Sequence, residues 1–513
     1  MNILISTKVL IFLSVLSIRT FGQEVSRPNI LLITVDDMNW NSVGAFGNSI
    51  ENITPNIDKL ADEGIRFQRA YVTAANCAPS RVSIQTGLYP HQSGARGFYY
   101  IDDKHTPTIS TELKSHGYYT GIINKSTDTN PAPRNDKYWD YRSGFNKVNK
   151  YSASMYAEKS SGFFDQTDKN GKPFYLVVNI ADPHKPNFNS PAAAKKGSDI
   201  YKPSRVISES EVSVPSFLLD LPAVRKDLRN YYNSVKRADD CVGAILTSLK
   251  SSGYHQNTLV IFLSDHGMPF PFAKSSVYDN GLRTPLIMKW PNKIKARLVR
   301  NEIVSSFDLF PTILDVAGLP VSDNPDYKGR SLIGTKNETG ERYAFGNFDE
   351  NSRGIPSPMR GVISKEWNYV FNAWSDDETQ MQSATMNHLT YKAMKKAAQN
   401  NEEIALRIKH FNYRQTEELY NLKDDPDCLI NLIEDPAFVQ RLHLMRSVLR
   451  NQMIDTDDYL LEAFDLKDND LKLKQFMTDQ RYQAGVRAQN LKWKRANNSV
   501  GSTKENQYLF QSN

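Results

Sequence analysis

The sequence predicts an α/β fold in which helices cover both faces of a doubly wound, mostly parallel sheet. Through roughly the first 330 residues, short runs of apolar and β-branched residues alternate with helical stretches, as expected for buried parallel strands. The runs that predict strands are 29–35, 120–123, 174–181 and 258–264. Polar residues follow each of these runs directly, which indicates a site at one edge of the sheet.

Start and stop signals predict the helices between these strands. Thr54 is an N-cap for a helix over 55–64, and a second helix is expected over 108–117. Gly253 ends a long helix over 223–252. The alternation of strand and helix therefore continues across the first two thirds of the chain.

A smaller domain is expected after residue 340, because the pattern changes from alternating elements to short strands. We expect a small antiparallel sheet from 341–348, 359–373 and 418–422, with a helix around 437–453 packed on it. This sheet is expected to form one wall of a substrate cleft.

Composition divides the chain into segments at 1–22, 23–340, 341–463 and 464–513. The first, with Lys8, an apolar run and small residues before Gln23, is typical of a secretory signal peptide. It is too short for a membrane anchor. The last segment is a polar tail in which Lys472 to Arg495 hold seven basic residues and one acidic residue, as much excess charge as the net +6 of the whole chain. A solvated polar helix is favoured for this tail over contact with an anionic polymer, and no nucleic-acid-binding module is found.

The four predicted strands end in side chains that can bind a ligand. Ligands of open α/β sheets bind beyond the carboxyl ends of the strands. A single acidic residue after a strand is more often a helix cap or a turn former, but four such ends together argue for a site. The strand ends are Asp36-Asp37, Asn124-Lys125, Asp182-Pro183-His184 and Asp265-His266.

The most specific string is Cys77-Ala78-Pro79-Ser80-Arg81, followed by Thr86-Gly87. Pro79 suits the first turn of a helix, so the Cys77 thiol would meet free backbone N–H groups and a positive dipole end. Such a place favours either a thiolate or an anionic substrate. The alternative is a buried structural cysteine, which is the expectation for Cys241 and Cys428.

This string resembles the signature of type I sulfatases, in which the cysteine of C-x-P-S-R is oxidised to formylglycine. Further strings occur in the sulfatase order, and Met268-Pro269-Phe270-Pro271 is most similar to the sulfamidase and polysaccharide sulfatase branch. The resemblance implies an alkaline-phosphatase-like fold. The other matching strings are Leu88-Tyr89-Pro90-His91, the Pro-His-x-Pro at His184, the Ser-Asp-x-Gly at Asp265, Lys274 with 278–285, 307–315 and 418–432.

The resemblance also implies a mechanism. One oxygen of the formylglycine hydrate made from Cys77 attacks sulfur, and the other then expels sulfate. Arg81 would hold the hydrate, while Lys125, His184 and Lys274 would neutralise sulfate and assist the leaving oxygen. One Ca²⁺ ion is implied, with Asp36, Asp37, Asp265, His266 and an oxygen of the converted Cys77 as ligands.

Two strings depart from the family. Asn124-Lys125-Ser126-Thr127 replaces the usual Gly-Lys-Trp-His, so the histidine that contacts the hydrate is missing, and Thr127 or another side chain is expected to take its place. Asp265-His266 replaces the commoner Asp-Asn pair. An imidazole ligand softens the site toward manganese or zinc, although calcium remains the expectation.

We therefore expect an exported, periplasmic or secreted sulfatase that acts on a sulfated polysaccharide, with an algal glycan such as ulvan favoured, and that needs a formylglycine-generating maturation enzyme. A heparan-type N-sulfatase, a phosphodiester or phosphonate hydrolase and a noncatalytic binder of sulfated glycans are the alternatives. Tyr99-Tyr100 and the region from Trp139 to Tyr141 are either sugar-stacking platforms or packing residues, and His91 is either structural or part of the substrate pocket.

Overall fold

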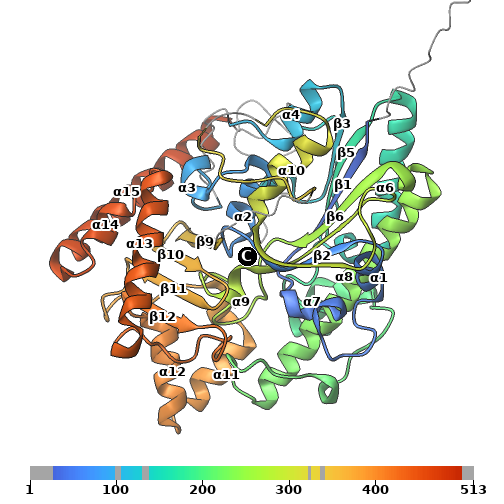
Figure 1. Ribbon diagram of the computed structural model, residues 1–513. Helices are drawn as coiled ribbons and strands as arrows, with labels where there is room; N and C mark the ends of the chain where they lie inside the picture. The colour runs from blue at the N-terminus through green and yellow to red at the C-terminus, as the bar shows by residue number, and fades with distance from the viewer. Residues whose placement is uncertain (1–26, 99–105, 130–137, 322–324, 335–340, 499–513) are drawn as a thin grey trace, which may run out of the picture.

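The computed structural model describes residues 27–98, 106–129, 138–321, 325–334 and 341–498 (Figure 1). The predicted signal segment and Tyr99-Tyr100 lie outside these residues. The described chain contains two sheets, which belong to different parts of the sequence.

The larger sheet has eight strands in the order β4-β3-β5-β1-β6-β7-β2-β8. Strands β4, β3, β5, β1 and β6 are mutually parallel, β7 runs antiparallel to both its neighbours, and β2 and β8 are parallel. This confirms the predicted α/β class with a mostly parallel sheet. In chain order the strands are β1 (Asn29–Val35), β2 (Ile65–Tyr71), β3 (Tyr119–Ile123), β4 (Tyr141–Ser143), β5 (Phe174–Asn179), β6 (Thr258–Ser264), β7 (Arg283–Lys289) and β8 (Leu298–Ser305).

Alternating side chains of the central strand β1 fill two separate cores, one on each face of the sheet. Leu31 and Ile33 belong to the core under α1 (Pro55–Asp62), α6 (Ala153–Asn170) and α8 (Pro222–Ser251). Ile30 and Leu32 belong to the core on the other face. Because both faces are covered, the strand is apolar throughout rather than alternating. The helices of the second face are α2 (Cys77–Thr86), α4 (Ile109–Ser115) and α10 (Leu309–Val316).

The smaller sheet is antiparallel, in the order β12-β11-β10-β9. The predicted strand 359–373 is two strands joined by a turn over 364–366. The strands are β9 (Ala344–Glu350), β10 (Pro356–Ile363), β11 (Trp367–Asn372) and β12 (Glu417–Asn421). The last strand of the large sheet ends at Ser305 and the first of the small sheet begins at Ala344, so the sheets fall on either side of residue 340. The exact domain boundaries remain predictions.

The remaining helices complete the two halves. The basic tail forms a long helix, but Leu473, Phe476 and Met477 on it are buried, so one side packs on the protein and the helix is not solvated all round. Every helix of the described residues is too short or too polar to cross a membrane. The helices not named above are α3 (Pro90–Ser93), α5 (Ser126–Thr129), α7 (Pro191–Lys196), α9 (Asp279–Leu282), α11 (Leu389–Ala397), α12 (Glu402–Tyr413), α13 (Val439–Asp455), α14 (Leu461–Asp465) and the tail helix α15 (Asp470–Asn498).

The small sheet is joined directly to the segment that leads into α2. The Asn347 N–H donates to the carbonyl of Thr73 at 2.7 Å, and the Asn76 side chain donates to the carbonyl of Glu350 at 3.2 Å. One continuous apolar core runs from Leu31 of the large sheet through the small sheet to Met477. The C-terminal part is therefore packed against the catalytic edge of the large sheet.

Candidate active site

The carboxyl ends of β1 and β6 bring three carboxylates together. Because these strands are adjacent and parallel, Asp36 and Asp37 lie beside Asp265 and His266. The Asp37 N–H donates to Asp265 Oδ1 at 3.0 Å, and all four residues are almost completely buried. Asp37 has a φ of 70°, an unusual value for a residue other than glycine. The structure thus brings together the predicted ends of β1 and β6, whereas Asp182, at the end of another predicted strand, pairs with Arg237 of the long helix α8.

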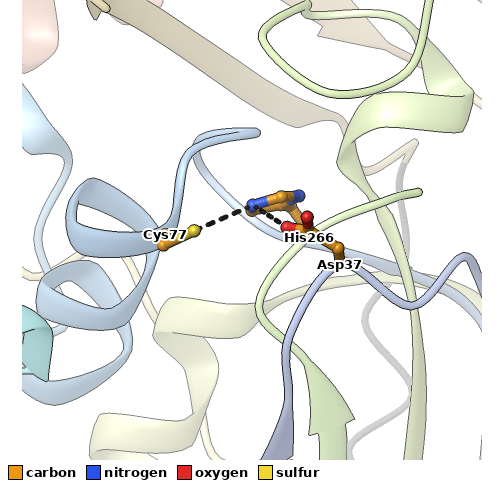
Figure 2. Close-up of side chains that lie close together, drawn as sticks. All are labelled: Asp37, Cys77 and His266. Atoms are coloured by element: carbon orange, nitrogen blue, oxygen red, sulfur yellow. Dashed lines mark hydrogen bonds and ion pairs between the residues drawn. The ribbon is translucent and has the colours of Figure 1, made fainter. Parts of the chain in front are cut away.

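Cys77 lies in the first turn of α2 and points into this cluster (Figure 2). Its Sγ is 3.5 Å from both Asp36 Oδ1 and His266 Nε2, and 3.7 Å from Lys274 Nζ. Burial raises the pKa of the Cys77 thiol well above its usual value. Lys274 lowers this pKa and the carboxylates of Asp36 and Asp265 raise it further, and the effect of burial prevails. The thiolate alternative from the sequence is therefore disfavoured, whereas the site for an anionic substrate remains.

The donor atoms here suit a divalent cation. Ligand atoms of Asp37, Cys77 and His266 lie within 4.8 Å of one another, as do those of Asp36, Cys77 and Asp265. His266 Nδ1 lies 2.9 Å from the carbonyl oxygen of Gly267, an acceptor that needs an N–H from this ring atom. Nε2, which lies 3.1 Å from Asp37 Oδ1, is therefore the ring nitrogen that would bind an ion. Hard carboxylate oxygens with one imidazole nitrogen fit calcium and tolerate softer ions.

Arg81 is the buried connection between Cys77's helix and the sheet. Its Nε and Nη2 donate to Asp265 Oδ2 at 3.1 and 2.9 Å, and its Nη1 donates to Thr34 Oγ1 at 2.6 Å and Asn179 Oδ1 at 2.5 Å. Burial would lower the pKa of Arg81, but Asp265 and Asp36 raise it above its usual range, so the guanidinium stays charged. Arg81 therefore fixes the Asp265 carboxylate in orientation.

Two lysines balance the remaining carboxylates. Lys274 Nζ donates to both oxygens of Asp37, at 2.7 and 2.9 Å, and Lys125 is paired with Asp36. Burial opposes the charge on both lysines, yet the paired carboxylates raise each pKa above its usual range. Lys125 follows Asn124 in a turn where both residues have positive φ, 49° and 65°. This turn directs the lysine back over the end of β1.

His184 lies at the end of the third predicted strand segment, beside the site but less central. Its Nδ1 is 2.6 Å from the carbonyl of Lys185, and no hydrogen bond joins it to Cys77 among the described residues. Burial lowers its pKa, although Asp37 and Asp36 oppose the shift. Burial thus disfavours the protonated form of the imidazole, and Nε2 is free of the backbone contact.

Thr127 makes no hydrogen bond with Cys77 among the described residues, so its role in place of the missing histidine stays a prediction. Its hydroxyl donates to Asp128 Oδ1 at 3.3 Å. The carboxylate of Asp128 acts on the charges of both Lys125 and Arg81, raising their pKa values. Sequence reasoning did not single out Asp128, although the string that contains Thr127 ends directly before it.

Two polar residues that shape the site, Thr34 and Asn179, were missed because each lies in an otherwise apolar strand. Both accept hydrogen bonds from Arg81, while Ser80 of the Cys77 to Arg81 string donates its hydroxyl to the carbonyl of Asp265 at 2.5 Å. Thr34 and Asn179 are polar residues near the ends of apolar strands, and a buried polar residue needs a partner. A polar residue in an otherwise apolar strand was therefore the sequence feature that could have identified Thr34 and Asn179.

His91 and the aromatic residues near Trp139 pack within the protein. His91 Nδ1 accepts from Asn347 Nδ2 at 2.7 Å, so the structural alternative holds for it. Trp139 is buried and stacks on Tyr175, and Tyr141 packs edge-on against Phe163. Neither aromatic ring is a free platform for a sugar.

A doubly wound sheet whose strand ends hold carboxylates around a helix-start cysteine defines a hydrolase with the alkaline-phosphatase-like fold. The chain belongs to the sulfatase family: the Sulfatase family model matches residues 28–319, and the N-sulphoglucosamine sulphohydrolase C-terminal model matches residues 265–381. It is accordingly a sulfuric ester hydrolase.

The similarity to known proteins extends over most of the chain. An ulvan-active sulfatase of Formosa agariphila is 27% identical over 473 residues, covering 82% of this chain and 74% of that protein. Human N-sulphoglucosamine sulphohydrolase is 30% identical over 469 residues, covering 84% and 91%. A solved structure of a putative sulfatase from Bacteroides fragilis has a TM-score of 0.64 at 20% identity, covers 85% of this chain and 98% of that one, and shows the shared fold.

Proposed function

We propose that this sulfatase is exported and removes sulfate from a sulfated polysaccharide or its oligosaccharides, with ulvan or a similar algal glycan as the favoured substrate. The observation that carries the proposal is the position of Cys77. It lies in the first turn of α2, among three carboxylates and Lys274, within an intact Cys77 to Arg81 string. The similarity to an ulvan-active sulfatase supports the choice of glycan.

Two groups complete the proposed chemistry. Formylglycine made from Cys77 supplies, as its hydrate, the oxygen nucleophile that sulfate ester hydrolysis requires. A calcium ion would be held by Asp36, Asp37, Asp265 and His266 and would supply positive charge next to the sulfate oxygens. The donor set described above fits such an ion.

The chain's own residues bind and orient the sulfate. Lys125 pairs with Asp36 and Lys274 pairs with Asp37, so two ammonium groups at the strand ends would attract an incoming sulfate. Arg81 keeps the Asp265 carboxylate fixed while charge builds up. Protonated His184 would donate a proton to the leaving oxygen from Nε2, the ring nitrogen that the contact of Nδ1 with the backbone leaves available.

The maturation and export of the protein are part of the proposal. The signal-like segment 1–22 supports export to the periplasm or the medium, and the complete C-x-P-S-R string supports recognition by a formylglycine-generating enzyme. Peptide mass spectrometry of residue 77, together with sulfate release from ulvan oligosaccharides, tests both steps. A fully active preparation that carries unmodified cysteine would refute the proposed nucleophile, and Cys77→Ala should abolish turnover in a folded protein.

A second candidate is hydrolysis of an N-sulfate on glucosamine, as in heparan. It is favoured by the match to the N-sulphoglucosamine sulphohydrolase C-terminal model and by the 30% identity to the human enzyme of that name. Comparing sulfate release from glucosamine N-sulfate and from ulvan oligosaccharides in one preparation separates the two. Release from the N-sulfate alone would make this the function.

A further inference from the structure

A groove separate from the active site lies along the edge of the large sheet. This groove of about 830 Å³ runs beside the edge strand β8, between β2 and the turn that joins β10 to β11. None of the residues that line it belongs to the active site described above. Its walls come from both sheets, because Arg69 of β2 donates a hydrogen bond to the carbonyl of Lys365 in that turn.

The groove is strongly cationic. Seven basic and two acidic side chains are among the described residues that line it, in a protein whose formal net charge is only +6. Basic residues concentrated in one groove raise the local concentration of an anionic partner and speed its capture. An uneven distribution of this size indicates a binding surface rather than a solvated face.

Five of the seven basic side chains fall into two groups with different roles. Arg300 pairs with Glu302 and Arg342 pairs with Asp308, so these arginines hold the walls of the groove. The ammonium groups of three lysines make no ion pair with any described residue, and all three side chains are exposed. These are Lys293, Lys295 and Lys365, referred to below as the groove lysines.

The floor of the groove is apolar, with Leu298 and Val299 of β8 still 38% and 43% exposed. A sulfated sugar chain presents apolar C–H faces and anionic substituents together, which matches an apolar floor with a basic rim. Nucleic acid is less well matched, because no aromatic residue for base stacking lines the described groove.

We propose that this groove binds a sulfated polysaccharide chain and holds the polymer beside the enzyme during turnover at the active site. This inference rests on the proposed function for the choice of polyanion. The groove lysines supply the contacts with sulfate groups. Binding is therefore expected to depend strongly on salt, as it does for other polyanions that release counterions.

The test compares two triple variants. In the first, the groove lysines are replaced by Lys293→Gln, Lys295→Gln and Lys365→Gln. The control removes three exposed lysines that do not line the groove, and thus the same amount of charge, through Lys169→Gln, Lys172→Gln and Lys250→Gln. Lys169 and Lys250 lie in the last turns of α6 and α8, and Lys172 follows α6. Binding to ulvan, to chemically desulfated ulvan and to a DNA duplex is measured over a range of NaCl concentrations in a Cys77→Ala background, which excludes turnover.

We expect the groove variant to lose affinity for ulvan by tenfold or more at low salt, with a shallower salt dependence, since about one unit of log–log slope is lost per ionic contact. The control variant should bind as the parent does. In otherwise wild-type protein, kcat/KM for a small aryl sulfate should be the same in both variants.

Unchanged ulvan binding in the groove variant would overturn the proposal. The proposal would also be overturned if the parent protein bound DNA more tightly than ulvan and the groove variant lost affinity for both to the same extent. If the wild type binds ulvan through the groove yet releases no sulfate from it, the groove assignment stands and the proposed substrate fails. If sulfate is released normally but groove and control variants bind alike, the groove assignment alone is wrong.

Discussion

Replacing Lys274 with methionine separates its catalytic role from its structural role. The ammonium group contacts both oxygens of Asp37, at 2.7 and 2.9 Å, and the side chain is only 8% exposed. Methionine keeps most of the volume and removes the charge. The substitution therefore removes one cation from the sulfate position and leaves the Asp37 carboxylate with one partner fewer.

The expected magnitude follows from these contacts. Removing one preorganised group that faces transition-state charge costs about 2 to 4 kcal/mol, which is roughly a 30- to 1000-fold fall in kcat/KM. Breaking a buried ion pair from one side also costs about 3 kcal/mol or more in the free energy of unfolding. Both quantities are measurable, the first by sulfate release and the second by denaturant titration.

Lys236 on α8 provides the matched control. It is 5% exposed and contacts Asp239 and Asp240 at 3.0 and 2.8 Å, far along the chain from the strand ends. Lys236→Met should lower the free energy of unfolding and leave kcat/KM within a few-fold of wild type. If a folded Lys274→Met enzyme with converted residue 77 kept kcat/KM within threefold of wild type, the assignment of Lys274 to sulfate would be refuted.

Three further predictions concern the metal, the backbone and pH. Chelation of the wild type and the substitution Asp265→Asn should each abolish sulfate release. Added calcium should restore activity to the chelated wild type and not to the Asp265→Asn variant. Full activity in metal-free protein would contradict the metal site. Gly267→Ala should reduce activity at least tenfold. The Cβ of the new alanine would lie 2.0 Å from the carbonyl oxygen of Asn280 and would displace the chain next to His266. Normal kinetics of this variant would show that the close approach of residue 267 to Asn280 is not needed. Burial lowers the pKa of His410 to about 4, although Glu418 opposes the shift, so the folded state binds fewer protons than the unfolded state between pH 4 and 6.5. Stability should therefore fall as the pH drops through this range, by at most about 3 kcal/mol from this residue, and denaturation of His410→Gln should show a flatter pH profile.

The sequence predicted the central parallel strands that are buried on both faces. It missed the partly exposed strands, and it also missed β7, which is buried except at its two ends. β1 and β6 are uninterrupted apolar runs, so their positions were predicted to the residue. β2 contains Arg66, Gln68 and Arg69, which are only partly buried, and it therefore lacks a clear period. The edge strand β8 and the three-residue β4 carry still weaker patterns.

The candidate site was predictable where one residue follows a strand and unpredictable where the contact depends on packing. The strand-end residues Asp36, Asp37 and Asp265 needed only the rule that parallel strands share a carboxyl edge. The family resemblance was needed to add Lys274, which lies in a loop with no regular pattern. That Asn179 would hold Arg81 depends on the strand order β5-β1-β6, which no local pattern reveals.

The apolar core that continues from Leu31 to Met477 has a consequence for how the protein unfolds. Elements that share one core lose their packing together, so the two sheets are expected to melt in a single transition. A fragment that ends near residue 340 would expose the apolar surface now covered by the small sheet and would lose the bond from Asn347 to Thr73, four residues before Cys77. The two sheets are thus separate in the fold, and we expect them to fold and unfold together as one unit.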